Sequence, residues 1–206
     1  MIKKDMTIVF QGDSITDAGR RDDPNEEGYG FAGITMRALK NMYPDYNLTL
    51  INKGLSGSKS RDVRGRWETE CLNYKPDIIV LLVGVNDCWH GMDNPADTVP
   101  LEAFQGNVEY LMKSAKDSGA KLVVIEPFIM THEVPNLTWL PVMAPMMFEY
   151  NKLAIKYADK FIGANSLFAK WCVKYGPYEI SEDGVHPNLF SHMLLAQEVI
   201  KELTEL

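Results

Sequence analysis

The chain has 206 residues, of which 46% are hydrophobic and 24% are charged, and its formal net charge is -7 at pH 7. This length and composition are typical of a globular protein that buries its own core, and we expect a single domain over residues 1–206. The acidic balance argues against nucleic acid and against an anionic membrane surface as partners.

The start of the chain and its cysteines bear on location. The N-terminal apolar run is short and is interrupted by Asp5 and Thr7, so we expect no signal peptide. No run approaches the roughly 18 apolar residues of a transmembrane helix. The three cysteines (Cys71, Cys88 and Cys172) are odd in number and include no CxxC pair. We interpret them as reduced thiols of a cytoplasmic protein.

Apolar runs alternate with amphipathic segments along the chain, which is the pattern of an α/β domain with a parallel sheet. The predicted strands, in chain order, are Met6–Gln11, Leu48–Asn52, Asp77–Val83, Lys121–Glu126 and Phe161–Ala164. The predicted helices are Tyr29–Tyr43, Ser60–Tyr74, Pro100–Ser118, Val142–Ala158, Ser166–Lys174 and Asn188–Leu203. The sequence contains no repeats or low-complexity tracts that would indicate a domain boundary.

Three polar, irregular segments follow predicted strands. They are Asp17–Gly28, Trp89–Val99 and Phe128–Pro141. In open α/β sheets, ligands bind at the carboxyl ends of the strands. The sequence therefore predicts a functional site at one edge of the sheet, built from these connections.

Ser14 directly follows the first predicted strand, in the stretch IVFQGDSITDAGR. The chain must turn there into a loop or short helix, which leaves the hydroxyl and the N–H of Ser14 at the edge of the sheet. A serine hydroxyl is a weak nucleophile that needs a neighbouring base. By itself this serine is more simply a turn or cap residue, and the pattern assigns no role to the nearby Asp17 and Arg20.

Two further stretches offer hydrogen-bond donors at strand ends. In NKGLSGS, the Gly54 N–H is a candidate donor to a developing oxyanion, although the same glycines also suit a tight turn. In GVND, Asn86 follows a buried strand and a glycine, so its amide is a second candidate donor. An Asx-type turn is the alternative for Asn86.

Near the C-terminus, the stretch EDGVHPN places Asp183 three residues before His186. This spacing allows the carboxylate to accept from Nδ1–H and leaves Nε2 as a base, although a surface loop with a helix cap fits the same pattern. Among the rival bases, His90, His132 and His192, the last two lack an acidic neighbour placed like Asp183. Together, the four stretches supply a nucleophile, a base and two oxyanion donors, which is what acyl transfer from an ester requires.

In order along the chain, the blocks GDSIT, NKGLSG, GVND and DGVHP resemble those of the SGNH, or GDSL-type, hydrolases. The resemblance implies a flavodoxin-like three-layer α/β/α sandwich with a five-stranded parallel sheet in the order 2-1-3-4-5. It implies a catalytic triad of Ser14, Asp183 and His186. It also implies an oxyanion hole formed by the N–H groups of Ser14 and Gly54 and by the side chain of Asn86.

A narrower resemblance runs through the longer stretches GDSITDAGR, NKGLSGSKSRDVRGRWETE, GVNDCWH and DGVHPNLFSHMLLAQ. These are similar to intracellular bacterial acetylxylan esterases, which deacetylate xylo-oligosaccharides. The resemblance implies a small acetylated saccharide as substrate, no cofactor, and a homo-oligomer. The same blocks are shared by lysophospholipases and related arylesterases and thioesterases, which stay as the alternative.

The sequence argues against two further interpretations. A non-catalytic flavodoxin-like binding module would need a phosphate loop, and the sequence contains neither GxxxxGK[ST] nor GxGxxG. No His, Cys and Asp cluster has the spacing of zinc ligands, so we expect no metal.

Four residues are candidates for binding the substrate. Trp89, Tyr29 and Trp139 offer aromatic faces to a sugar, although simple burial explains any one of them. Asp13, next to Ser14, is the fourth candidate. Asp13 and Asp87 also suit structural roles, such as loop hydrogen bonds or helix caps.

Overall fold

A parallel sheet forms the centre of the protein. The computed structural model describes residues 2–206, except for the side chain at position 134. The sheet has five strands in the order β2-β1-β3-β4-β5, and all neighbouring strands are parallel. The predicted strand order is thereby confirmed. The strands are β1 (Thr7–Gly12), β2 (Thr49–Asn52), β3 (Ile78–Leu82), β4 (Lys121–Ile125) and β5 (Lys160–Ile162).

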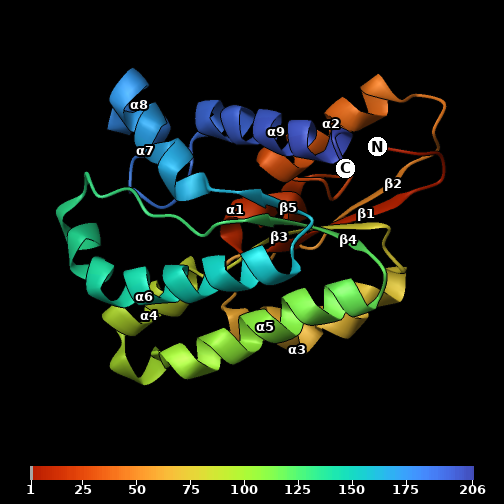
Figure 1. The fold of residues 1–206 in the computed structure, drawn as a ribbon. Helices are drawn as coiled ribbons and strands as arrows, with labels where there is room; N and C mark the ends of the chain where they lie inside the picture. The colour runs from red at the N-terminus through yellow and green to blue at the C-terminus, as the bar shows by residue number, and fades with distance from the viewer. Residues whose placement is uncertain (1) are drawn as a thin grey trace.

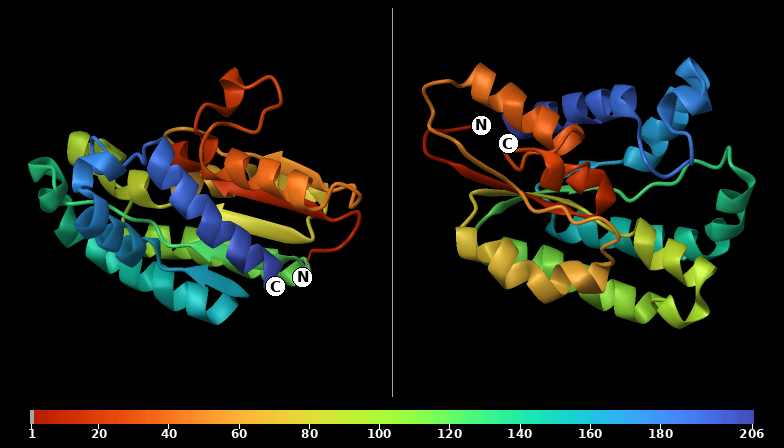
Figure 2. Two further views of the ribbon diagram at one scale, coloured as in Figure 1. Left: turned by 90° about the horizontal axis from the view of Figure 1, so that it is seen from above. Right: turned by 180° about the vertical axis from the view of Figure 1, so that it is seen from behind.

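Helices cover both faces of this sheet (Figures 1 and 2). On one face, α2 (Phe31–Met42) packs against α9 (Leu189–Thr204). On the other face, α5 (Leu101–Asp117) packs between α3 (Ser60–Glu70) and α6 (Val134–Tyr157). This arrangement is the three-layer α/β/α sandwich that the sequence predicts.

The remaining helices lie in the connections. They are α1 (Ser14–Asp17), α4 (Val85–Asp93), α7 (Ala164–Tyr175) and α8 (Pro177–Ile180), with 3-10 turns at η1 (Arg20–Asp22), η2 (Leu72–Tyr74) and η3 (Pro95–Asp97). Across residues 2–206, none of the helices is both long and apolar enough to reach across a lipid bilayer.

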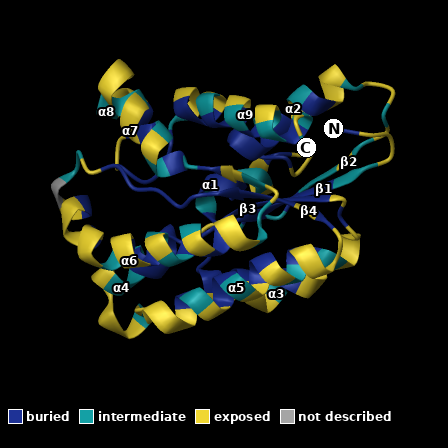
Figure 3. Cartoon of the chain, viewed as in Figure 1, coloured by how far each residue is buried: buried dark blue, intermediate teal, exposed yellow. Residues whose placement is uncertain are grey.

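The strands β1, β3 and β4 are largely buried because helices cover both faces of the sheet, as their dark blue colour in Figure 3 shows. All five residues of β3, the run IIVLL, are buried. Such continuous β-branched and aliphatic runs are typical of parallel strands with two covered faces. In register, Phe10 of β1 lies beside Asn52 of β2 and Val80 of β3. The carboxyl ends of the central strands therefore meet at one edge, where the polar connections leave the sheet.

The helix α6 differs from the prediction, because it begins at Val134 inside the segment predicted to be irregular. Pro135 lies in the first turn of the helix. Backbone N–H groups have no partner within the helix there, so a residue without an N–H fits. Pro141 lies inside the helix, where it removes one backbone hydrogen bond. Buried side chains at Trp139 and Met143 give this part of the helix an apolar face that offsets the loss.

Candidate active site

Ser14 is the first residue of α1, immediately after β1. The Asp13 side chain caps this helix, because its Oδ1 accepts from the Ile15 N–H at 3.0 Å. A Cβ at Gly12 would lie 2.2 Å from the Leu82 carbonyl oxygen, so only glycine allows the turn. Among residues 2–206 the Ser14 N–H has no hydrogen-bond partner. The strand exit therefore presents both a hydroxyl and a free N–H.

The structure brings Ser14, His186 and Asp183 together in one hydrogen-bonded chain. Ser14 Oγ lies 2.9 Å from His186 Nε2, across 172 positions of sequence. His186 Nδ1 lies 2.7 Å from Asp183 Oδ2. The other oxygen, Asp183 Oδ1, accepts from the N–H groups of Val185 and His186 at 2.8 Å each. With the carboxylate fixed in this way, Nδ1 carries the proton and Nε2 accepts the hydrogen of the serine hydroxyl.

Asp183 and His186 each stabilise the charged form of the other. Burial opposes ionisation of Asp183, but hydrogen bonds from the His186 ring and from the His186 and Val185 amides outweigh it, so the pKa of Asp183 is well below its usual range. The hydrogen bond to Asp183 in turn raises the pKa of His186 above 6.5, against the opposing effect of burial. An imidazole of this kind accepts a proton more readily than a free histidine does.

Asn86 and Asp87, in the first turn of α4, are both buried beside the start of α3. Asn86 Nδ2 donates to the Ser58 carbonyl at 3.1 Å, and this bond leaves the second amide hydrogen for another acceptor. Asp87 accepts from the N–H of Ser60 at 2.8 Å and from its hydroxyl at 2.5 Å. Asp87 therefore has a structural role, as the sequence suggested.

The structure corrects the assignment of Gly54 as an oxyanion donor. Its N–H donates to Asn52 Oδ1 at 2.9 Å and is therefore already engaged. Glycine is required at this position for another reason: a Cβ would lie 2.3 Å from the Asp17 backbone nitrogen. The loop after β2 thus packs directly on the backbone of α1, a long-range contact that no local pattern reveals.

A different amide of the same loop is free. The Ser58 N–H donates to the Leu55 carbonyl at 3.1 Å and closes a turn in which Gly57 has a φ of 79°. Within the described chain, residues 2–206, the Gly57 N–H has no hydrogen-bond partner, and the residue is exposed. The neighbouring Ser58 carbonyl holds the Asn86 amide, so Gly57 lies next to the second candidate donor.

Of the three aromatic candidates for substrate binding, Trp89 is the one whose ring lies against the triad. The centroid of its ring lies 5.7 Å from that of His186 and 5.3 Å from that of Trp139. Tyr29 is 53% exposed, and its hydroxyl donates to the Asp22 carbonyl at 3.3 Å, within its own loop. Asp13 is only 1% exposed and caps α1, so its assignment to substrate binding is wrong.

The rival histidines have other partners. His192 Nδ1 accepts from the Phe31 N–H at 3.1 Å, and burial lowers the pKa of His192 to about 4. His132 Nε2 lies 3.0 Å from the Ser181 carbonyl oxygen. The His90 ring packs against Trp89. Within residues 2–206, no group of three or more His, Cys, Asp or Glu side chains is placed to hold a metal ion.

A hydroxyl, an imidazole and a carboxylate joined in this order at the edge of a parallel α/β sheet are the arrangement of serine hydrolases, which act by nucleophilic acyl transfer. Residues 10–192 match the GDSL-like Lipase/Acylhydrolase family. The chain belongs to this family and is a carboxylic ester hydrolase.

Similar proteins extend this result. The chain is 27% identical to an acetylxylan esterase of Geobacillus stearothermophilus, in a match that covers 95% of this chain and 93% of that enzyme. The crystal structure of Axe2, an acetylxylan esterase from the same species, matches with a TM-score of 0.86 at 26% identity, over 98% of this chain and 95% of that one. Two related structures are catalytic mutants of Axe2, in which a serine or an aspartate is replaced by alanine. LAE5, an alpha/beta hydrolase from the metagenome of Lake Arreo, shares the fold with a TM-score of 0.86 at 24% identity, over 97% of this chain and 95% of that one.

Proposed function

We propose that this ester hydrolase removes acetyl groups from small acetylated saccharides such as xylo-oligosaccharides, with Ser14 as the nucleophile. The observation that carries the proposal is the hydrogen-bonded chain Ser14–His186–Asp183, with the ring of Trp89 beside His186. Similarity to an acetylxylan esterase over nearly the whole chain supports the saccharide substrate.

The reaction proceeds in two steps. His186 Nε2 takes the hydroxyl proton as Ser14 Oγ attacks the acetyl carbonyl, and Asp183 stabilises the imidazolium that forms. The bond from the carbonyl carbon to the sugar oxygen then breaks, and His186 gives its proton to that oxygen. Water attacks the acetyl-serine with His186 as base. Acetate leaves, and the proton returns to Ser14 Oγ.

Three donors hold the oxyanion of each tetrahedral intermediate. The Ser14 N–H and the free hydrogen of the Asn86 amide are the first two. We assign the third to the Gly57 N–H instead of the Gly54 N–H, because Gly57 is the free amide of this loop and lies next to the Ser58 carbonyl that holds Asn86. Donors fixed before the reaction stabilise the developing charge without reorganisation.

Hydrolysis of lysophospholipids, longer aryl esters or thioesters is the alternative, since it needs the same triad. One experiment separates these substrates. Acetylated xylo-oligosaccharides, lysophosphatidylcholine and aryl esters of increasing acyl length are incubated with the protein, and the released acid is measured. We expect acetate from the saccharide and a steep loss of rate beyond the acetyl ester. Fatty acid from lysophosphatidylcholine, with no acetate from the saccharide, would establish the alternative.

The variant Ser14→Ala is the control for the mechanism. We expect it to lose essentially all hydrolysis of an aryl acetate while its far-UV circular dichroism stays unchanged, because the side chain is small and lies at the edge of the sheet. A folded Ser14→Ala protein that still hydrolyses the ester would show that Ser14 is not the nucleophile.

A further inference from the structure

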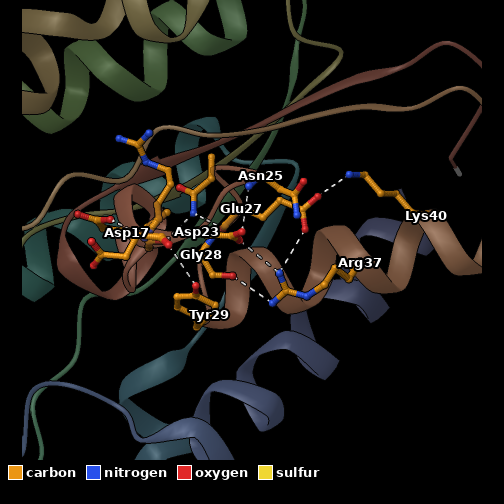
Figure 4. A network of polar contacts seen from close by, with 12 residues as sticks. Asp17, Asp23, Asn25, Glu27, Gly28, Tyr29, Arg37 and Lys40 are labelled. Atoms are coloured by element: carbon orange, nitrogen blue, oxygen red, sulfur yellow. Dashed lines mark hydrogen bonds and ion pairs between the residues drawn. The ribbon is translucent and has the colours of Figure 1, made fainter.

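Asp17, the last residue of α1, is a buried carboxylate that accepts hydrogen bonds from neutral donors. It is 5% exposed. Its Oδ2 accepts from both the N–H and the hydroxyl of Ser56, each at 2.9 Å, and its Oδ1 accepts from the Arg20 N–H at 3.1 Å. Figure 4 shows Asp17 at the edge of the polar network that orders the chain between α1 and α2.

Within residues 2–206, the carboxylates of Asp23 and Glu27, two other acidic residues of that network, form no hydrogen bond or ion pair with the loop after β2. Asp23 accepts from the N–H groups of Asn25 and Gly28 at 3.0 Å each, inside its own loop (Figure 4). Its Oδ2 also lies 3.8 Å from Nη1 of Arg37 in α2. Glu27 forms ion pairs with Arg37 and Lys40 of α2. Among these three acidic residues, Asp17 is therefore the one whose carboxylate joins α1 to the loop between β2 and α3.

Two further contacts join the same segments. Arg20 Nε donates to the Gly54 carbonyl at 3.2 Å, and Asn52 Nδ2 donates to the Thr16 carbonyl at 2.8 Å. The loop after β2 is thus fixed against the helix of the nucleophile at Asn52, Gly54 and Ser56. The environment of Asp17 is therefore explained by the loop contact.

The contact with Ser56 has a consequence for the next peptide. Ser56 is held by both its backbone N–H and its hydroxyl, so its rotation is restricted, and the Gly57 N–H follows directly in the chain. Gly57, with a φ of 79°, belongs to the residue type that rotates most freely when nothing fixes the preceding residue. Restricting Ser56 therefore restricts the direction of the Gly57 N–H.

We propose that Asp17 is a positioning residue for the oxyanion site: through Ser56, it holds the Gly57 N–H in the direction from which it meets the developing charge. This inference rests on the proposed function, because it requires that the oxyanion forms on an ester attacked by Ser14. Arg20 supports the same loop at Gly54, which gives a role to both residues that the sequence pattern left unassigned.

The test compares Asp17→Ala with Asp23→Ala, a matched control from the same loop that removes a buried carboxylate with two backbone donors. Steady-state kinetics on an aryl acetate and thermal unfolding are measured for both. We expect Asp17→Ala to lower kcat by about 10- to 100-fold with KM within about twofold, since loss of a whole oxyanion donor costs on the order of 10²–10³. Asp23→Ala should lower the unfolding temperature while kcat stays within about twofold.

Two milder variants and a second readout keep the test decisive. Asp17→Asn retains one acceptor oxygen and Ser56→Ala retains the backbone bond, so each should lose part of the kcat that Asp17→Ala loses. The rate of labelling by a fluorophosphonate, which forms a tetrahedral adduct at serine, should fall in parallel. Unchanged kcat in the folded Asp17 variants, or equal losses in the Asp17 and Asp23 variants, would overturn the inference. Failure of the proposed function is distinguishable, because it appears as wild-type protein without Ser14-dependent hydrolysis.

Discussion

The indole of Trp89 lies against the imidazole of His186, with 5.7 Å between the ring centroids and 56° between the ring planes. Behind it, the buried Trp139 packs on Trp89 at 5.3 Å. Trp89 follows Asn86 by three residues on α4, so one helix presents both the amide proposed as an oxyanion donor and the aromatic ring beside His186. Under the proposed function, we expect the ring to meet the alcohol part of the ester while the amide meets the acyl part.

Replacing Trp89 should weaken binding of a saccharide more than it weakens chemistry. We expect Trp89→Ala to raise KM for an acetylated xylo-oligosaccharide by about 5- to 10-fold, since an aromatic stack contributes on the order of 1 kcal/mol. Trp89→Phe should retain most of the affinity. Trp171→Ala removes a half-buried indole from α7, which packs on Phe168, and serves as the control. A saccharide KM that Trp89→Ala leaves unchanged would exclude a binding role for the ring.

The pH dependence should report His186. Because the hydrogen bond to Asp183 raises the pKa of His186 above 6.5, kcat/KM should rise with pH along a limb whose midpoint lies above 6.5. Asp183→Asn removes the charge that raises this pKa, so the midpoint should move to lower pH and the rate should fall by about 10²–10⁴.

A matched histidine controls this experiment. His192 is buried and its pKa is about 4, so its charge does not change along the limb. His192→Gln should therefore leave the midpoint in place. If Asp183→Asn had the wild-type midpoint, His186 would not be the group that titrates.

Asn86 should contribute to the transition state and little to substrate affinity. Removing one oxyanion donor costs on the order of 10²–10³ in kcat, and we expect a loss of that size for Asn86→Ala with little change in KM. Asn151→Ala is the control, because Asn151 donates to Glu126 at 2.7 Å through a similar amide outside the triad. A loss confined to KM would assign Asn86 to substrate binding instead.

Asp13 should make stability depend on pH. Burial raises the pKa of Asp13 from 3.8 to about 7, although its hydrogen bond from Ile15 opposes the shift. The folded protein therefore keeps a proton that the unfolded chain releases, so this stability is present below pH 3.8 and is lost as pH rises through about 7. Burial of Asp87 raises its pKa to about 6, which adds a loss of the same sign.

Urea unfolding at pH 5 and at pH 8 measures this effect. Asp13→Asn keeps the Oδ1 that caps Ile15 but cannot ionise. The free energy of unfolding of Asp13→Asn, relative to that of the wild type, should therefore increase from pH 5 to pH 8. The increase is roughly 2 kcal/mol for every 1.5 pH units between pH 5 and the pKa of Asp13. A difference between the two proteins that stays constant with pH would contradict the proposed protonation of Asp13.

The sheet and the pair Asp183–His186 could be predicted because their signals are local, whereas Ser14, 172 positions away from His186, was joined to this pair by the family resemblance. Each buried strand is a continuous apolar run, and Asp183 and His186 lie three residues apart, within reach of one hydrogen bond. The role of Gly54 could not be predicted, because glycine is required there by the close approach of the Asp17 backbone, 37 positions earlier in the chain. Its neighbour Gly57 offered the same residue type, and only the hydrogen bonds of the folded loop separate the two.

The start of α6 shows a signal that was present and was outweighed. The segment 128–141 was predicted to be an irregular connection, yet Trp139, Met143 and Met146 recur at helical spacing and are all buried. The apolar periodicity was therefore the better guide to this helix. Packing on the core offsets a backbone hydrogen bond lost at Pro141.

Asp17 and Asp87 are both buried, and both accept hydrogen bonds from neutral donors. These donors are backbone N–H groups and serine hydroxyls. Dissolved ions screen charges that face the solvent, as in the pair Lys113–Asp117, but do not intervene between such donors and a buried oxygen. The hydrogen bonds of Asp17 with Ser56 and of Asp87 with Ser60 should therefore be insensitive to ionic strength.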